Sequence, residues 1–83
     1  MESLKFDLRG ATDEVKKMVV DKLKAMGYQG EPYPSNFYFY TVYASGYCSK
    51  HGYSLNYGNN MKTFYKNKGR EVEIDDFLKD WVT

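Results

Sequence analysis

The alternation of apolar and polar side chains predicts a strand and then a helix in the first third of this chain. Residues 4–8 alternate strictly between apolar and polar side chains, which is the pattern of a half-buried strand. Residues 12–26 instead carry apolar side chains at helical spacing, and Thr12 offers an N-cap at the first turn. Gly27 follows the last apolar position, where a left-handed C-cap is favoured.

The second half of the chain predicts mainly strands. Residues 37–44 place apolar or aromatic side chains on both sides, which favours a central strand. Residues 53–57 are apolar on one side only, and residues 71–74 alternate once more. Residues 61–65 are predicted to form a further short extended piece, with a helical turn as the alternative.

Turn-forming residues separate these segments. Residues 29–35 contain two prolines and predict a linker, because proline lacks a backbone donor and opposes both helix and central strand. Residues 45–52 have glycines near both ends and predict a turn or loop. Asp75 is predicted to cap a short C-terminal helix at about residues 76–82.

These elements predict one α+β domain spanning residues 1–83, with a small antiparallel sheet of about four strands. The main helix and the short C-terminal helix are expected to pack on that sheet. No apolar run reaches the roughly 18 residues that a membrane-spanning helix needs, so no membrane partner is expected. The first residues lack the apolar core of a signal peptide, and Cys48 is a lone thiol. We therefore expect a cytoplasmic protein.

Charge is distributed unevenly although the formal net charge is only +1. Residues 1–31 hold equal numbers of acidic and basic side chains, whereas residues 32–70 hold no acidic side chain at all. Residues 71–83 are predominantly acidic. The sequence thus places a basic middle segment before an acidic end, and the two signs would cancel on the surface if these parts pack together.

The aromatic residues concentrate in and beside the acid-free segment, and most of them are tyrosines. Nine tyrosine hydroxyls need water or a hydrogen-bond partner, and a chain of 83 residues cannot bury them all. Because exposed aromatic patches usually mark binding sites, we predict a partner-binding surface of tyrosines and basic residues. Its predicted members are Tyr38, Tyr40, Tyr43, Tyr47, Tyr53, Tyr57, Lys50, Lys62, Lys66, Lys68 and Arg70.

The alternative interpretation of the same segment is structural. In it the aromatic rings form the core, and the lysines only solvate strand edges or discourage edge-to-edge pairing. This interpretation applies most strongly to Phe37, Phe39 and Phe64, which we expect in the core.

The sequence holds no pattern of catalytic or metal-ligating residues. Cys48 and His51 are three residues apart, but their loop is rich in glycine and no third group is evident to orient the pair. One cysteine and one histidine cannot supply the roughly four ligands of a zinc site. Asp75, Asp76 and Asp80 fit helix capping and a solvated face better than a cation site. We therefore expect a protein that is not an enzyme and carries no cofactor.

Four short motifs occur in order along the chain: residues 26–28 at the end of the helix, the aromatic strand 37–40, the turn 55–60, and residues 71–78. With these motifs the chain resembles a group of small accessory proteins encoded by tailed bacteriophages. The resemblance implies a phage origin and action by binding, often to host enzymes or defence systems.

Three functions are compatible with this sequence. The first is a non-enzymatic binding protein that inhibits a host or defence macromolecule, with tyrosines as anchors and basic side chains steering an acidic partner. The second is a protein that binds single-stranded RNA or DNA through the same surface, with rings stacking on unpaired bases. The third is a small oligomer that captures a nucleotide-like ligand between subunits.

Overall fold

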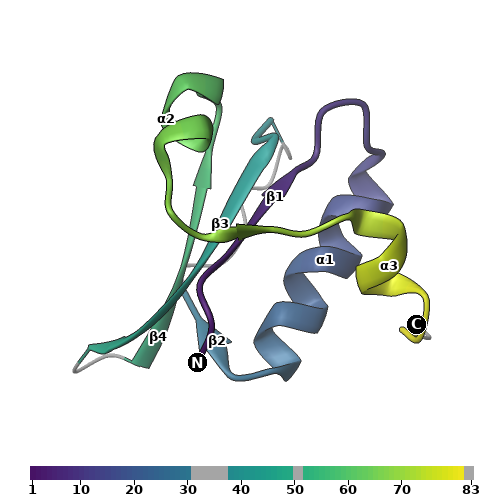
Figure 1. The fold of residues 1–83 in the computed structure, drawn as a ribbon. Helices are drawn as coiled ribbons and strands as arrows, with labels where there is room; N and C mark the ends of the chain where they lie inside the picture. The colour runs from purple at the N-terminus through teal and green to yellow at the C-terminus, as the bar shows by residue number, and fades with distance from the viewer. Residues whose placement is uncertain (31–37, 50–51, 82–83) are drawn as a thin grey trace.

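Across residues 1–30, 38–49 and 52–81, which the computed structural model describes, the chain forms a five-stranded sheet and three helices (Figure 1). The predicted α+β class is confirmed. The elements follow in the order β1 Leu4–Asp7, α1 Asp13–Ala25, β2 Tyr28–Gln29, β3 Thr41–Ser49, β4 Gly52–Gly58, α2 Met61–Lys66, β5 Arg70–Glu71 and α3 Ile74–Leu78.

The sheet has the strand order β2-β4-β3-β1-β5 and is mixed. β3 pairs antiparallel with both β4 and β1, whereas β2 runs parallel to β4 and β5 runs parallel to β1. The structure thus corrects the predicted sheet, which was to be antiparallel with about four strands. β2 has two residues, too few to show the alternation by which a sequence reveals a strand. β5 was expected at residues 71–74, and its parallel pairing with β1 was not foreseen.

Helix α1 matches its prediction because its signals are local. The Thr12 side chain accepts a hydrogen bond from the backbone N–H of Val15 at 3.2 Å, as an N-cap does. At the other end Gly27 has a φ of 112°, a conformation that costs glycine little and other residues more. The predicted helix of residues 12–26 is therefore confirmed to within its caps.

Replacing Thr12 with alanine is expected to lower the free energy of unfolding by about 1 kcal/mol. The variant loses the side-chain acceptor for the Val15 N–H but keeps every apolar contact of α1 with the sheet. Urea denaturation followed by circular dichroism measures the change. Thr12→Ser is the matched control, since serine retains the hydroxyl, and an equal loss in both variants would contradict the capping role.

One face of the sheet forms the core. Residues directly opposite each other in neighbouring strands share a face, so Phe6 with Val42, and Ala44 with Leu55, all point the same way. These side chains are buried and pack against α1. Figure 1 shows α1 and α3 on that side of the sheet and α2 on the other.

Helix α2 replaces the extended piece predicted at residues 61–65. The Asn60 side chain accepts hydrogen bonds from the backbone N–H groups of Lys62 and Thr63, at 2.9 and 3.3 Å, and so starts a helical turn. The Phe64 side chain is 1% exposed and packs this turn against the sheet. The extended piece is therefore wrong and its stated alternative, a helical turn, is confirmed. The sequence left both open because Gly58, Asn59 and Asn60 are typical both of a turn and of a helix start.

The remaining boundaries differ from the sequence prediction in several places. β3 begins at Thr41, so the described residues 38–40 of the strand predicted at 37–44 lie outside it. β3 continues to Ser49 with an irregular register between Ala44 and Cys48, where a loop was predicted. Pairing at residues 71–74 ends after Glu71. Helix α3 begins at Ile74, so Asp75 lies in its first turn and does not cap it.

Candidate binding site

The face of the sheet that points away from α1 is polar, and we call it the polar face. Lys5 lies opposite Tyr43 in the sheet, and Tyr43 lies opposite Asn56, so the three side chains share one face. Along β1, β3 and β4 they alternate with the core residues, which point to the other face. Helix α2 covers part of this face, where the ring of Phe64 lies 6.2 Å from that of Tyr43. The rest of the face is uncovered by α2 and is where the candidate site lies.

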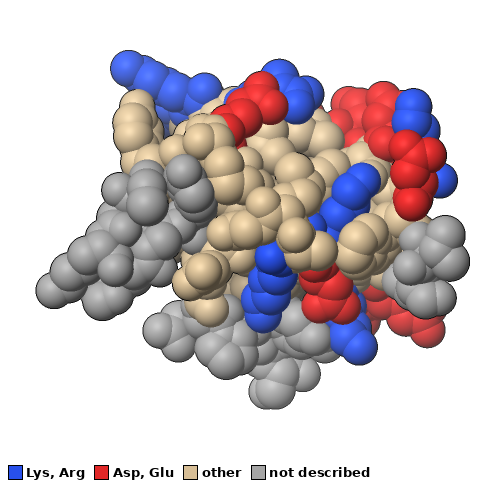
Figure 2. Space-filling view, turned by 90° about the horizontal axis from the view of Figure 1, so that it is seen from below, with Lys and Arg blue, Asp and Glu red and all other residues tan. Residues whose placement is uncertain are grey.

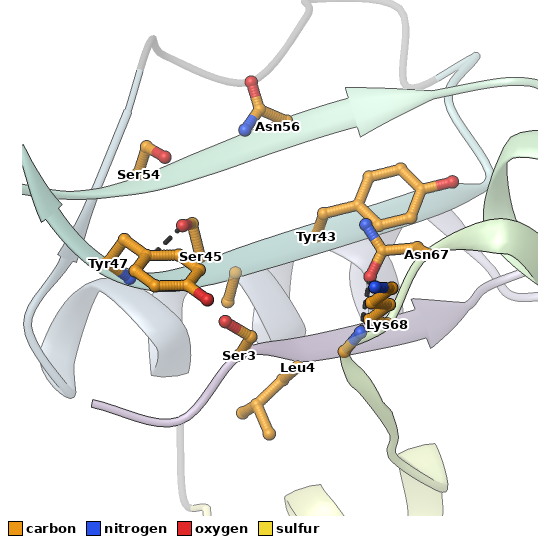
Figure 3. Close-up of a pocket in the computed structure, with 11 residues that line it drawn as sticks. Ser3, Leu4, Tyr43, Ser45, Tyr47, Ser54, Asn56, Asn67 and Lys68 are labelled. Atoms are coloured by element: carbon orange, nitrogen blue, oxygen red, sulfur yellow. Dashed lines mark hydrogen bonds between the residues drawn. The ribbon is translucent and has the colours of Figure 1, made fainter.

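Beside α2 the polar face holds a hollow with a volume of about 420 Å³ (Figure 3). Among the described residues that line the hollow, none is acidic. The rings of Tyr43 and Tyr47 lie toward opposite ends of it in Figure 3, both carried by β3. The other polar side chains that line it are Ser3, Ser45, Ser54, Asn56, Asn67 and Lys68.

The end of the hollow near Tyr47 is built from β3 and the residues before β1. The Ser3 hydroxyl accepts a hydrogen bond from the backbone N–H of Gly46 at 2.8 Å. The Ser45 hydroxyl accepts one from the N–H of Tyr47 at 3.3 Å. Position 46 has no room for a side chain, because a Cβ there would lie 2.0 Å from the carbonyl oxygen of Met1. A glycine at this position therefore lets the first residues pass close to β3.

The segment that follows α2 forms the opposite wall of the hollow, and Lys5 fixes the position of this segment. The Lys5 ammonium group donates hydrogen bonds to the carbonyl oxygens of Phe64 and Asn67, at 2.8 and 3.0 Å. It also lies 4.6 Å from the centroid of the Phe64 ring. The Asn67 side chain in turn accepts a hydrogen bond from the Gly69 N–H at 2.7 Å. Lys5, absent from the predicted site, thus positions the residues that form this wall.

The structure separates the predicted tyrosines. Tyr43 and Tyr47 line the hollow, and Tyr47 is 85% exposed. Tyr38 is 76% exposed but does not line the hollow. The Tyr40 hydroxyl donates to the carbonyl oxygen of Asn59. Of the five predicted tyrosines whose side chains the structure describes, two therefore line the same site.

Tyr57 belongs to the other face of the sheet. Its ring lies 4.9 Å from that of Phe39, and it packs against the core on the side of α1. Phe39 and Phe64 are buried, as the structural interpretation predicted for these two rings. The predicted contacts of Lys50, Phe37 and the Tyr53 side chain lie outside what the structure describes.

The predicted basic residues also divide into two groups. Lys62, Lys66 and Lys68 are exposed and form no ion pair within the described part of the chain. Arg70 instead binds the carboxylate of Glu2 through two nitrogen–oxygen contacts of 2.7 and 3.0 Å. This pairing lowers the pKa of Glu2 and raises that of Arg70. Arg70 is therefore engaged within the protein, and Lys68 is the predicted basic residue that lines the hollow.

The charge separation along the sequence is not preserved in space. Figure 2 shows Lys and Arg interspersed with Asp and Glu over the side of the molecule that faces the viewer. The contact of Arg70 with Glu2, 68 positions apart, is one cause of this mixing. The described residues that line the hollow thus include no acidic side chain, whereas the side of the molecule seen in Figure 2 carries both signs of charge.

The small polar residues of the hollow were not predicted as site residues. Ser54 and Asn56 were visible in the sequence only as the polar side of the strand at residues 53–57. Strand pairing and the turn after α2 bring three more polar residues to the hollow, Ser3, Ser45 and Asn67. No local sequence pattern indicates either effect. Residue type alone would not have identified them, because isolated serines and asparagines are common on every protein surface.

The described residues contain no group of three or more His, Cys, Asp or Glu side chains placed to hold a metal ion. No helix in this part of the chain combines the length and the apolar character needed to cross a membrane. The Cys48–His51 pair lies outside the side chains that the structure describes, so its expected lack of a catalytic role stays a prediction.

No protein-family model matches this chain, and no curated protein or solved structure matches it either. A function is therefore inferred from the geometry and chemistry of the hollow.

Proposed function

We propose that this protein is a non-enzymatic binding protein that contacts a partner protein through the hollow on its polar face. The observation that carries this proposal is the residue composition of the hollow, which combines two tyrosine rings with serine and asparagine side chains. Antibody paratopes use the same residue types for a physical reason. Tyrosine gives a large contact area at a small cost in conformational entropy, and serine and asparagine give adaptable hydrogen bonds.

Two features favour a protein partner over single-stranded nucleic acid. Nucleic-acid binding needs a basic surface that follows the phosphate backbone, but the sequence pI is about 7.8 and the charges are mixed on the side of the molecule that Figure 2 shows. It also needs rings that are free to stack on successive bases. Tyr43 packs beside Phe64, and Tyr57 packs against Phe39, which leaves Tyr47 as the highly exposed ring of the hollow.

The bacteriophage origin and the inhibition of a host or defence macromolecule are part of this proposal. They rest on the resemblance of the sequence motifs, and they identify a bacterial lysate as the source in which to search for the partner. The absence of a catalytic function is likewise proposed, on the ground that the described residues lining the hollow include no nucleophile beside a base that could activate it.

Replacing Tyr47 with serine is expected to reduce capture of the partner from a bacterial lysate at least tenfold. A ring this exposed adds little to the fold but supplies a large contact area to a bound protein. Affinity capture with quantitative mass spectrometry measures the effect, with and without nuclease. We expect nuclease treatment to leave the captured protein unchanged.

Tyr65→Ser is the matched control for this experiment. Tyr65 is also a surface ring, 65% exposed on α2, but it does not line the hollow. Capture within twofold of the wild type is expected for this variant. Equal losses in both variants, or capture that disappears after nuclease treatment, would refute the proposed use of the hollow for a protein partner.

A further inference from the structure

The hydrogen-bonding groups of the hollow are biased toward donors. The hydroxyl oxygens of Ser3 and Ser45 each accept a backbone N–H, from Gly46 and Tyr47. A hydroxyl that accepts in this way keeps its own proton for donation. In the structure as described, neither side chain donates that proton to another protein group. Both hydroxyls are therefore available to donate to a ligand.

Asn67 shows the same bias on the opposite wall. Its side-chain oxygen accepts the backbone N–H of Gly69, so the amide NH2 group is the part left to interact with a ligand. Lys68 adds three donors and a positive charge. No acidic side chain lines the hollow to neutralise this charge, and Lys68 has no ion-pair partner among the residues described. The hollow thus offers donors from two walls and one uncompensated charge.

We propose that the hollow receives a carboxylate side chain from an acidic segment of the partner protein. This inference rests on the proposed function and names the chemistry of the partner. A carboxylate accepts several hydrogen bonds and carries no donor, which complements the groups that Ser3, Ser45, Asn67 and Lys68 present. The bonds formed by Lys68 would be charge-assisted, which makes them stronger than bonds between neutral groups.

The size of the hollow fits an extended segment with more than one acidic residue. A volume of about 420 Å³ falls in the range of about 300–1,000 Å³ typical of sites that enclose a whole ligand, and exceeds the need of one carboxylate group. Ser54 and Asn56 on β4 lie along the hollow in Figure 3 and can bond the backbone of such a segment. Tyr47 at one end offers a ring against which the methylene groups of a glutamate can pack.

The test uses a short synthetic peptide of alternating glutamate and glycine as the probe. Its glutamine counterpart has nearly the same shape but no charge. Binding is followed by two-dimensional NMR of the isotopically labelled protein. We expect the glutamate peptide to shift the amide signals of Gly46, Tyr47 and Gly69, whose N–H groups bond the side chains that line the hollow. The glutamine peptide is expected to bind at least tenfold more weakly.

Lys68→Gln is expected to weaken binding of the glutamate peptide at least tenfold and to reduce its dependence on salt. Lys66→Gln is the matched control, because Lys66 is also exposed and without an ion-pair partner in the described region, yet does not line the hollow. Binding within twofold of the wild type is expected for that variant. Both substitutions lie on the surface, and the unperturbed NMR spectrum of each variant verifies its fold.

Three outcomes would overturn the inference. They are equal binding of the two peptides, shifts that Lys68→Gln leaves unchanged, and shifts at the hollow caused by a short oligothymidine but not by the glutamate peptide. Failure here is distinguishable from failure of the proposed function. If Lys68→Gln still captures the partner protein while Tyr47→Ser does not, the binding function stands and only its acidic chemistry is wrong.

Discussion

Replacing Phe64 with alanine is expected to lower the free energy of unfolding by about 3–5 kcal/mol, the range for removal of a buried phenylalanine. Phe64 is the buried residue of α2, and its ring contacts Tyr43 and the Lys5 ammonium group. Removal of the ring leaves α2 with no buried side chain among its own residues. A helix of six residues has little intrinsic stability in water, so the packing of the Phe64 ring is a main support of α2.

Urea denaturation measures the change, and Tyr65→Ala is the control. Tyr65 follows Phe64 directly on α2 but is exposed, so its replacement is expected to change stability by at most about 0.5 kcal/mol. Because Phe64→Ala could unfold a chain this small altogether, Phe64→Leu provides a measurable intermediate loss. If alanine at position 64 costs no more than alanine at position 65, α2 is held by something other than the Phe64 ring.

Replacing Lys5 with methionine is expected to lower the free energy of unfolding by about 2 kcal/mol. Methionine retains much of the aliphatic side chain, so the variant removes mainly the charge and its hydrogen bonds. Those bonds go to the carbonyl oxygens of Phe64 and Asn67, which are left without this donor. The contact of the ammonium group with the Phe64 ring is lost as well.

The control for this prediction is Lys62→Met, since Lys62 is exposed and without an ion-pair partner in the residues described. Its stability is expected to stay within about 0.5 kcal/mol of the wild type. Lys5→Met is also expected to weaken binding of the glutamate peptide, because Lys5 positions the wall that carries Lys68. Equal stability of the two variants would refute the structural role of Lys5.

The elements that sequence patterns predicted correctly are those whose stability is encoded locally. Helix α1 has its cap at Thr12, its apolar stripe and its terminal Gly27 within one stretch of chain, and all were visible. β1 and β4 were likewise predicted from alternation over four or more residues. β2 has no such pattern and pairs only with β4, so the sequence did not indicate it. The alternation at residues 71–74 indicated β5 but placed it too far along the chain, since its pairing with β1 covers Arg70 and Glu71.

The candidate site was harder to predict from the sequence than the strands and helices were. The sequence predicted that tyrosines and lysines of the acid-free segment would share one surface, and the structure brings together Tyr43, Tyr47 and Lys68. Tyr57 was assigned to that surface, but the register of β4 with β3 turns its ring to the core. Arg70 was assigned there as well, but Glu2 binds it across the β1–β5 end of the sheet. Such effects of register and long-range pairing cannot be derived from composition.

The position of β1 inside the sheet has a consequence for how this protein is made. β1 is synthesised before the other strands of the sheet, yet its neighbours are β3 and β5, and its partners in β5 are Arg70 and Glu71. Ser3 and Lys68 therefore come to line the same hollow only after residues 67–71 have left the ribosome. Contacts of such long sequence separation slow folding, because the loop between them must close first. The hollow is thus incomplete in a nascent chain until β5 has been synthesised, and the partner binding proposed above would begin only after that point.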